Sequence, residues 1–216
     1  MKNLTIKKLL LPEVTAADIP GLLDQQHLPF QVLNCINWEE FSYRPQVRFR
    51  LAHTGKAFLL NFRVREETIR ARYGTDNGDV WKDSCVEFFL NPAGDNVYYN
   101  LECNCAGTLL IGAGSTRQGR MRAPAEITSR VDRWCSLGRQ PFGERPDTDG
   151  WEVALMIPVD ALFQHRISSL TGRQIRANFY KCGDELKTPH FVSWNPIHTP
   201  KPDFHRPEFF GKLELE

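Results

Sequence analysis

The chain is dominated by short segments in which large apolar residues alternate with polar ones. From Phe58 to Val64 every second residue is large and apolar, which is the period of a strand with one buried face. Similar runs, separated by turn-forming residues, occur at 47–51, 84–90, 97–105, 109–113, 131–137, 151–157, 175–181, 191–194 and 210–215. About ten strands without intervening helices predict an all-β fold, an antiparallel β-sandwich of the immunoglobulin or jelly-roll kind.

Helical periodicity is confined to two segments. Residues 15–24 are interrupted by Pro20 and Gly21, and the pattern of 159–170 allows three helical turns. The sequence has no repeat or linker, and strands continue on both sides of the longest loop-like stretch, 139–150. We therefore expect one domain over residues 1–216, with residues 1–29 as an N-terminal extension packed on it.

Composition excludes several classes of protein. With 27 basic and 26 acidic residues the net charge is +1, so no strong field attracts nucleic acid or an anionic membrane. No apolar run approaches the roughly 18 residues of a membrane helix. The N-terminus lacks the apolar core of a signal peptide, which predicts a cytoplasmic protein, or a secreted or periplasmic one if a signal was removed. The six cysteines, without a CxxC pair, are expected to be reduced and mostly buried.

Several strands have a polar side opposite their apolar side. In 97–105, for example, Leu101 and Cys103 lie on the apolar side. Carboxylates, amides and guanidinium groups on one sheet face suit the hydroxyls of a sugar, although a solvated face held by ion pairs would show the same pattern. The polar candidates are Arg63, Arg65, Glu87, Asn100, Glu102, Asn104 and Arg176.

Aromatic residues add a second feature of sugar sites. Trp81 lies in a polar, glycine-containing segment, and Trp194 lies at a strand end before Pro196. An exposed indole offers a flat apolar platform for a sugar ring, whereas any single Trp can equally be a core residue. Trp151, in step with apolar neighbours, is expected in the core. The proline-rich stretch within 178–211 is expected to form one wall of the site around Trp194.

Four short motifs together resemble the family 9 carbohydrate-binding modules, which are β-sandwiches attached to xylanases and also found in free-standing bacterial proteins. Residues 81–90 (WKDSCVEFFL) resemble the W-x-x-D-S-x-E-x-F strand of that family. The other similar segments are 151–158 (WEVALMIP), 193–195 (SWN) and 209–213 (FFGKL). The resemblance spans about residues 30–216.

The resemblance implies non-catalytic binding of a mono- or oligosaccharide in carbohydrate catabolism. A sugar ring would lie between Trp81 and Trp194, and Glu87 would bind its hydroxyls. Further polar partners would come from Asn100, Glu102 and Asn104, between which spacing does not choose. From the polar strand faces, independently of the resemblance, we expect Arg63, Arg65 or Arg176 to supply hydrogen-bond donors. No oligomeric state follows from the sequence.

Two other functions stay open. Glu87 and Glu102 could serve a glycoside hydrolase, which in the retaining case needs carboxyl groups about 5–5.5 Å apart. A protein-interaction domain would also present aromatic loops. The sequence assigns no catalytic residue.

No cofactor or metal is expected from the sequence. His190, His198 and His205 are spaced by 8 and 7 residues, which matches no compact zinc pattern despite Cys182 and Asp184 nearby. The same histidines are the only candidates for axial ligands of a haem. Some members of the resembled family hold structural calcium, for which the turns 76–79 and 147–150 offer oxygen atoms.

Overall fold

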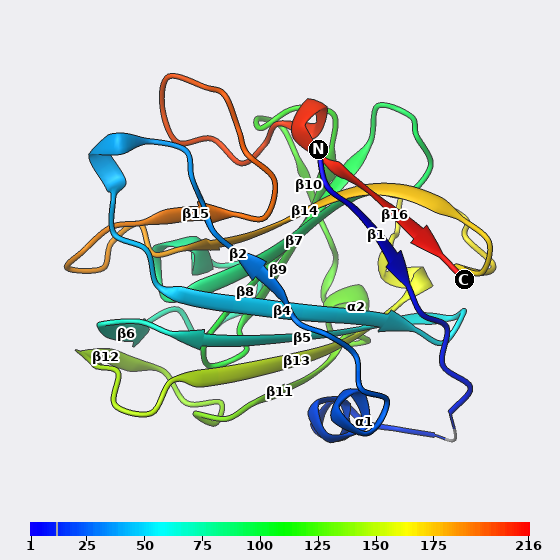
Figure 1. The fold of residues 1–216 in the computed structure, drawn as a ribbon, viewed down its shortest axis with the longest axis horizontal. Helices are drawn as coiled ribbons and strands as arrows, with labels where there is room; N and C mark the ends of the chain where they lie inside the picture. The colour runs from blue at the N-terminus through cyan, green and yellow to red at the C-terminus, as the bar shows by residue number, and fades with distance from the viewer. Residues whose placement is uncertain (12) are drawn as a thin grey trace.

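The computed structural model describes residues 1–11 and 13–216. Two sheets pack face to face, which confirms the predicted β-sandwich (Figure 1). In the larger sheet the described strands have the order β1-β16-β14-β7-β8-β9-β10, and β15 joins β14 to β3. The smaller sheet has the order β11-β13-β5-β4-β2, and β6 pairs with β12 beside it.

The strands of the larger sheet have the following bounds: β1 (Asn3–Ile6), β3 (Cys35–Ile36), β7 (Cys85–Asn91), β8 (Tyr98–Asn104), β9 (Leu109–Gly114), β10 (Met121–Arg122), β14 (Gln174–Cys182), β15 (Phe191–Ser193) and β16 (Gly211–Leu215). The other strands are β2 (Gln31–Leu33), β4 (Gln46–His53), β5 (Ala57–Arg65), β6 (Thr68–Ala71), β11 (Asp132–Cys135), β12 (Phe142–Pro146) and β13 (Trp151–Pro158). The helices are α1 (Ile19–Gln25), α2 (Ala125–Thr128) and the short 3-10 turns η1 (Ala16–Asp18), η2 (Glu39–Phe41), η3 (Val80–Lys82), η4 (Val159–Ala161) and η5 (Pro207–Phe209).

The main core lies between the two sheets and is built around stacked phenyl rings. Phe49 of β4 stacks on Phe179 of β14 at 3.7 Å between ring centroids, and Phe179 stacks on Phe88 of β7 at 4.9 Å. Strand alternation places these rings on the inner faces, as the sequence predicted. Trp151 is also buried in this core, as expected.

A second apolar layer covers the outer face of the larger sheet. Residues 195–210 cross this face, and their Ile197, Phe204 and Phe210 pack on Phe89 and Tyr180 of the sheet. Tyr180 and Phe204 stack with ring centroids 4.2 Å apart. The outer face is therefore only partly open to solvent, and its polar residues lie beneath a loop.

The short helical segments differ from the expectation. Residues 159–170 form only the turn η4, because the backbone beyond it is held by Tyr99 of β8. The Tyr99 hydroxyl accepts a hydrogen bond from the Gln164 backbone N–H at 2.8 Å and lies 2.7 Å from Nδ1 of His165. In contrast α1 forms across Pro20, which lies in the first turn, where proline is tolerated.

The N-terminal segment adds a strand to the larger sheet and packs a helix on the smaller one. β1 pairs with β16, the one parallel pair between described strands of the larger sheet, and the two run side by side in Figure 1. α1 packs on the outer face of the smaller sheet, where Ile19 and Leu23 contact Leu59 and Ala154. No helix in the described part of the chain is long and apolar enough to cross a membrane.

Candidate functional site

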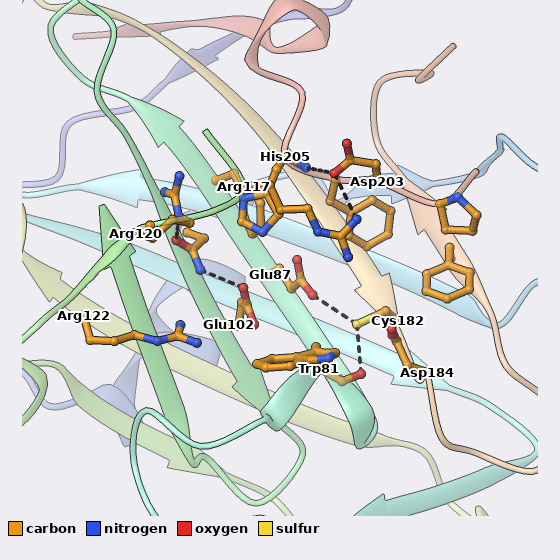
Figure 2. Close-up of a pocket in the computed structure, with 16 residues that line it drawn as sticks. Trp81, Glu87, Glu102, Arg117, Arg120, Arg122, Cys182, Asp184, Asp203 and His205 are labelled. Atoms are coloured by element: carbon orange, nitrogen blue, oxygen red, sulfur yellow. Dashed lines mark hydrogen bonds and ion pairs between the residues drawn. The ribbon is translucent and has the colours of Figure 1, made fainter. Parts of the chain in front are cut away.

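A cavity of about 390 Å³ opens on the outer face of the larger sheet. Its floor is formed by side chains of β7, β8 and β14, one side by η3, and the other side by residues 202–205 and the segment 117–122 that leads into and includes β10 (Figure 2). The lining combines aromatic rings, carboxyl groups and arginines: Trp81, Glu87, Phe89, Asn100, Glu102, Arg117, Gly119, Arg120, Arg122, Cys182, Asp184, Phe191, Pro202, Asp203, Phe204 and His205.

Two carboxyl groups lie next to each other on the floor. Glu87 and Glu102 are register partners on the neighbouring strands β7 and β8, and only 3% and 4% of their surface is exposed. Their positions follow from alternation, since Val86 and Phe88 point into the main core and Glu87 therefore points out of it. The Glu87 Oε1 accepts a hydrogen bond from the Cys182 thiol at 3.0 Å.

Burial keeps both acids protonated to an unusual extent. Loss of hydration raises the pKa of Glu102 to about 7, against which its hydrogen bond from Asn100 acts. Burial, together with the neighbouring Glu102 charge, raises the pKa of Glu87 well above its ordinary value. Burial likewise raises the pKa of Asp184, at the edge of the cavity, to about 6. At neutral pH the pair can therefore both donate and accept hydrogen bonds.

Asn100 links the acid pair to an arginine. Its Nδ2 donates to Glu102 Oε1 at 2.7 Å, and its Oδ1 accepts from Nε of Arg120 at 2.8 Å. Arg120 also donates to the Tyr98 carbonyl and stacks over the Tyr98 ring, so this guanidinium is held in place. Gly112, the β9 partner of Asn100, leaves the necessary room, because a Cβ there would lie 2.5 Å from Asn100 Oδ1.

Trp81 forms the aromatic side of the cavity. It lies in η3 and is half-buried, and its carbonyl accepts a hydrogen bond from the Asp184 backbone N–H at 3.2 Å, which fixes η3 to the loop after β14. Figure 2 shows the two floor carboxyl groups between Trp81 on one side and Arg117 with His205 on the other. The cavity thus offers one aromatic face and several polar groups converging from the floor and the opposite side.

The opposite side is a fixed loop segment. Asp203 pairs with Nε of Arg206 at 2.7 Å and with Arg117 at 3.6 Å, and His205 Nδ1 lies 3.1 Å from the Tyr98 hydroxyl. Burial and the nearby arginines lower the pKa of His205 to about 3, so this imidazole is neutral at physiological pH.

The structure brings four of the sequence-predicted residues into one cavity: Trp81, Glu87, Asn100 and Glu102. Trp194 is not among the lining residues. It is 1% exposed and packs edge-on against Phe49 and Phe179 in the main core. The expected clamp between Trp81 and Trp194 is therefore not formed, because the two indoles lie on opposite faces of the larger sheet.

The other predicted polar residues have structural contacts outside the cavity. Arg63 and Arg65 belong to β5 and alternate with its core residues, so they lie on the outer face of the smaller sheet, where Arg63 pairs with Glu152 at 2.7 Å. Arg176 donates to the carbonyls of Glu208 and Phe210. The fully buried Asn104 donates to the Tyr73 carbonyl and to Asp83.

The sequence did not single out the remaining lining residues as sugar-binding residues. Arg117, Arg120 and Arg122 lie in 115–122, a segment that follows β9 and ends in β10 and whose only signal was its three arginines. Pro202, Asp203 and His205 belong to the proline-rich stretch that was expected to form a wall, although around Trp194 rather than opposite Trp81. The position of Phe191 could have been found by alternation: the next residue, Val192, points into the core, so Phe191 points to the outer face.

Most of the oxygen atoms considered for calcium are already hydrogen-bonded. Both Asp76 carboxylate oxygens accept from Arg133 at 2.8 Å, and the Asp147 carboxylate accepts from the backbone N–H of Glu66 and Gly150. A different set of donors is gathered at the floor of the cavity. One ligand atom each of Cys85, Glu87 and Cys182 lies within 4.8 Å of the other two.

Comparisons with known proteins agree on one family. The family model described as carbohydrate-binding family 9 matches residues 17–215. A crystal structure of a proposed carbohydrate-binding protein from Bacteroides uniformis is 48% identical, with a TM-score of 0.97 over 100% of this chain and 99% of that chain.

More distant solved structures share the fold. A family 9 module from Caldicellulosiruptor kristjanssonii in complex with cellotriose is 11% identical, with a TM-score of 0.61 over 100% of this chain and 94% of that chain. The glucose complex of a family 9 module from the same organism is 12% identical, with a TM-score of 0.56 over 100% of this chain and 96% of that chain. A comparison with curated proteins gave no match. Since the family model matches most of the length of this chain, the chain belongs to carbohydrate-binding family 9.

Proposed function

We propose that this protein binds a sugar ring without transforming it, in the cavity between Trp81 and the segment 202–205. The apolar face of the ring packs on the Trp81 indole, and its hydroxyls bind Glu87, Glu102 and Asn100 on the floor. The family 9 modules whose structures hold glucose and cellotriose support a neutral glucoside as the first ligand to test.

The observation that carries the proposal is an unpaired polar atom in the floor. Oε2 of Glu102 is buried and has no hydrogen-bond partner, while Oε1 is occupied by Asn100. A buried polar group without a partner costs about 1–3 kcal/mol, and a ligand hydroxyl would remove that cost. Trp81, half-exposed beside it, offers the apolar surface that a sugar ring needs.

The arrangement of the acids favours binding over hydrolysis. Glu87 and Glu102 extend from neighbouring strands of one floor, so both reach a bound ring from the same side. A glycoside hydrolase places its acid and its nucleophile or base on either side of the bond that is broken. Two adjacent acids with raised pKa values instead suit hydrogen bonds to vicinal hydroxyls.

Calorimetric titration with glucose, cellobiose, cellotriose and a wider sugar panel tests the proposal. We expect Trp81→Ala and Glu102→Gln each to weaken binding about tenfold or more, the equivalent of about 1.4 kcal/mol. Arg176→Ala, outside the cavity, is the matched control and should bind like the wild type. Sugar recovered unchanged by chromatography supports binding alone.

Two results would contradict this function. Equal affinity in Trp81→Ala and wild type would remove the cavity as the binding place. Release of a shorter sugar that is lost in Glu87→Gln would show hydrolysis instead.

A further inference from the structure

The floor of the cavity gathers two thiols and a carboxyl group that are far apart in the sequence. Cys85 and Cys182 are register partners on β7 and β14, and Glu87 follows Cys85 by two residues, so all three lie on the same face of the sheet. Each is at most 3% exposed, and their ligand atoms lie within 4.8 Å of one another.

Besides Asp203, the cavity is lined by three acids and three arginines, and no ion pair joins these described arginines to these three acids. Among the described residues, Glu87, Glu102 and Asp184 make no ion pair, and Oε2 of Glu102 has no hydrogen-bond partner. The nearby Arg120 is occupied by Asn100 and by backbone carbonyls, and Arg117 pairs with Asp203. Glu87 and Glu102 are buried without a direct ion pair, which disfavours their ionised forms, and a divalent cation would stabilise Glu87 as a carboxylate.

We propose that Cys85, Cys182 and Glu87 form a binding site for a thiophilic divalent cation of the Zn²⁺ type. Two thiolates and a carboxylate are three of the four ligands that such an ion takes, and Asp184, beside Cys182, or a water molecule supplies the fourth. On binding, the two S–H bonds and the Glu87 carboxyl O–H lose their protons to solvent, and no electrons are transferred.

The distances allow this coordination with small side-chain rotations. Ligand atoms about 2.0–2.3 Å from a tetrahedral zinc ion lie roughly 3.3–3.8 Å apart, so these atoms, within 4.8 Å of one another, would move closer by up to about 1–1.5 Å. Calcium does not fit, because it takes about 6–8 oxygen ligands, whereas thiolates select softer ions. The sequence gave no zinc pattern because the cysteines come from strands separated by about half the chain and meet only through the β7–β14 pairing.

The test uses the intact, reduced protein with Cd²⁺ and Co²⁺ as spectroscopic probes and Zn²⁺ as competitor, without sugar. We expect one ion per chain, a charge-transfer absorption of the intensity of two thiolates, and displacement of both probes by Zn²⁺. Cys85→Ala and Cys182→Ala should each halve that absorption. They should also weaken binding beyond the about 10–100-fold that loss of a supporting residue causes.

Cys103→Ala is the matched control, because Cys103 is equally buried on β8 but faces the main core, and it should bind like the wild type. Glu87→Gln, which keeps the shape of the side chain, tests the site if a cysteine variant does not fold, and it should also weaken binding. The proposal would be overturned if the wild type did not bind the ions saturably, or if its spectrum showed no thiolate ligation. It would also be overturned if Glu87→Gln and both cysteine variants bound the ions with the affinity of the wild type.

Discussion

Glu87 and Glu102 face each other across two neighbouring strands with nearly all of their surface buried, and no cation among the described residues pairs with either. Two acids in this position hold protons at pH values where exposed carboxyl groups have lost them. The stability of the protein should therefore depend on pH through this pair, which also lines the proposed ligand cavity.

Stability should fall as pH rises through the range in which the folded protein keeps protons that the unfolded chain releases. The pKa of Glu102 is raised from 4.5 to about 7, so between these values the folded state binds more protons than the unfolded state. The free energy of unfolding should then decrease by up to about 1.4 kcal/mol per pH unit for each such group. Urea denaturation from pH 4.5 to 8 measures this slope.

Glu102→Gln provides the check on that slope. Glutamine cannot ionise, so the variant should show a flatter dependence than the wild type, while the exposed Glu126→Gln should leave the slope unchanged. A wild-type stability that rises across this range would contradict the assignment.

Gly112→Ala should disturb the floor of the cavity without touching a ligand. The added methyl group would lie 2.5 Å from Asn100 Oδ1, so Asn100 must shift away from Glu102 and Arg120. We expect a loss of about 1–3 kcal/mol in stability, as for other overpacked sites, and several-fold weaker sugar binding. Gly143→Ala has open space around its Cβ and should change neither denaturation midpoint nor calorimetric affinity.

Trp194 should matter for stability and not for the ligand. Its indole fills the main core against Phe49 and Phe179, so Trp194→Ala should destabilise the protein by about 3–5 kcal/mol. The milder Trp194→Phe should fold and bind sugar with wild-type affinity by calorimetry. If Trp194→Phe lost binding while its denaturation midpoint stayed normal, the indole would have to contact ligand after all.

A buried charge network between the sheets gives a further prediction. Lys181 and Glu66 are fully buried and pair at 2.8 Å, and Glu66 also accepts a hydrogen bond from Trp151 at 2.8 Å. Glu66→Gln leaves the Lys181 ammonium without its counter-charge and should lower stability by about 3–5 kcal/mol. The double variant Glu66→Gln with Lys181→Met should recover part of this loss in thermal denaturation. No recovery would mean that the pair contributes little.

Alternation along single strands predicted most of the fold and the polar residues on the floor of the site. It placed Glu87, Asn100 and Glu102 on a common polar face, because the side-chain period of two is a local property. The same pattern could not assign Arg63 to a sheet, since strands of both sheets alternate alike and only long-range pairing separates them.

Trp194 shows a different reason for error. It stands in step with Val192, which is buried in the main core, while Phe191 and Ser193 point to the other face. Alternation within this short strand therefore favoured a core position for Trp194. The prediction of an exposed indole relied instead on the location of Trp194 at a strand end, before Pro196. The arginines at 117–122 depend on how the chain returns from β9 to β10, which no local pattern records.

The division of β8 between the cavity and the core has a consequence for how this protein can change. Asn100 and Glu102 face the cavity, whereas Leu101 and Cys103 between them pack in the core. Substitutions at the first set can select a new ligand while the second set preserves the packing that folds the chain. If the proposed site binds the ligand, specificity and foldability are encoded at alternate positions of the same strand, and a library varied only at the outward positions would test ligands on an intact scaffold.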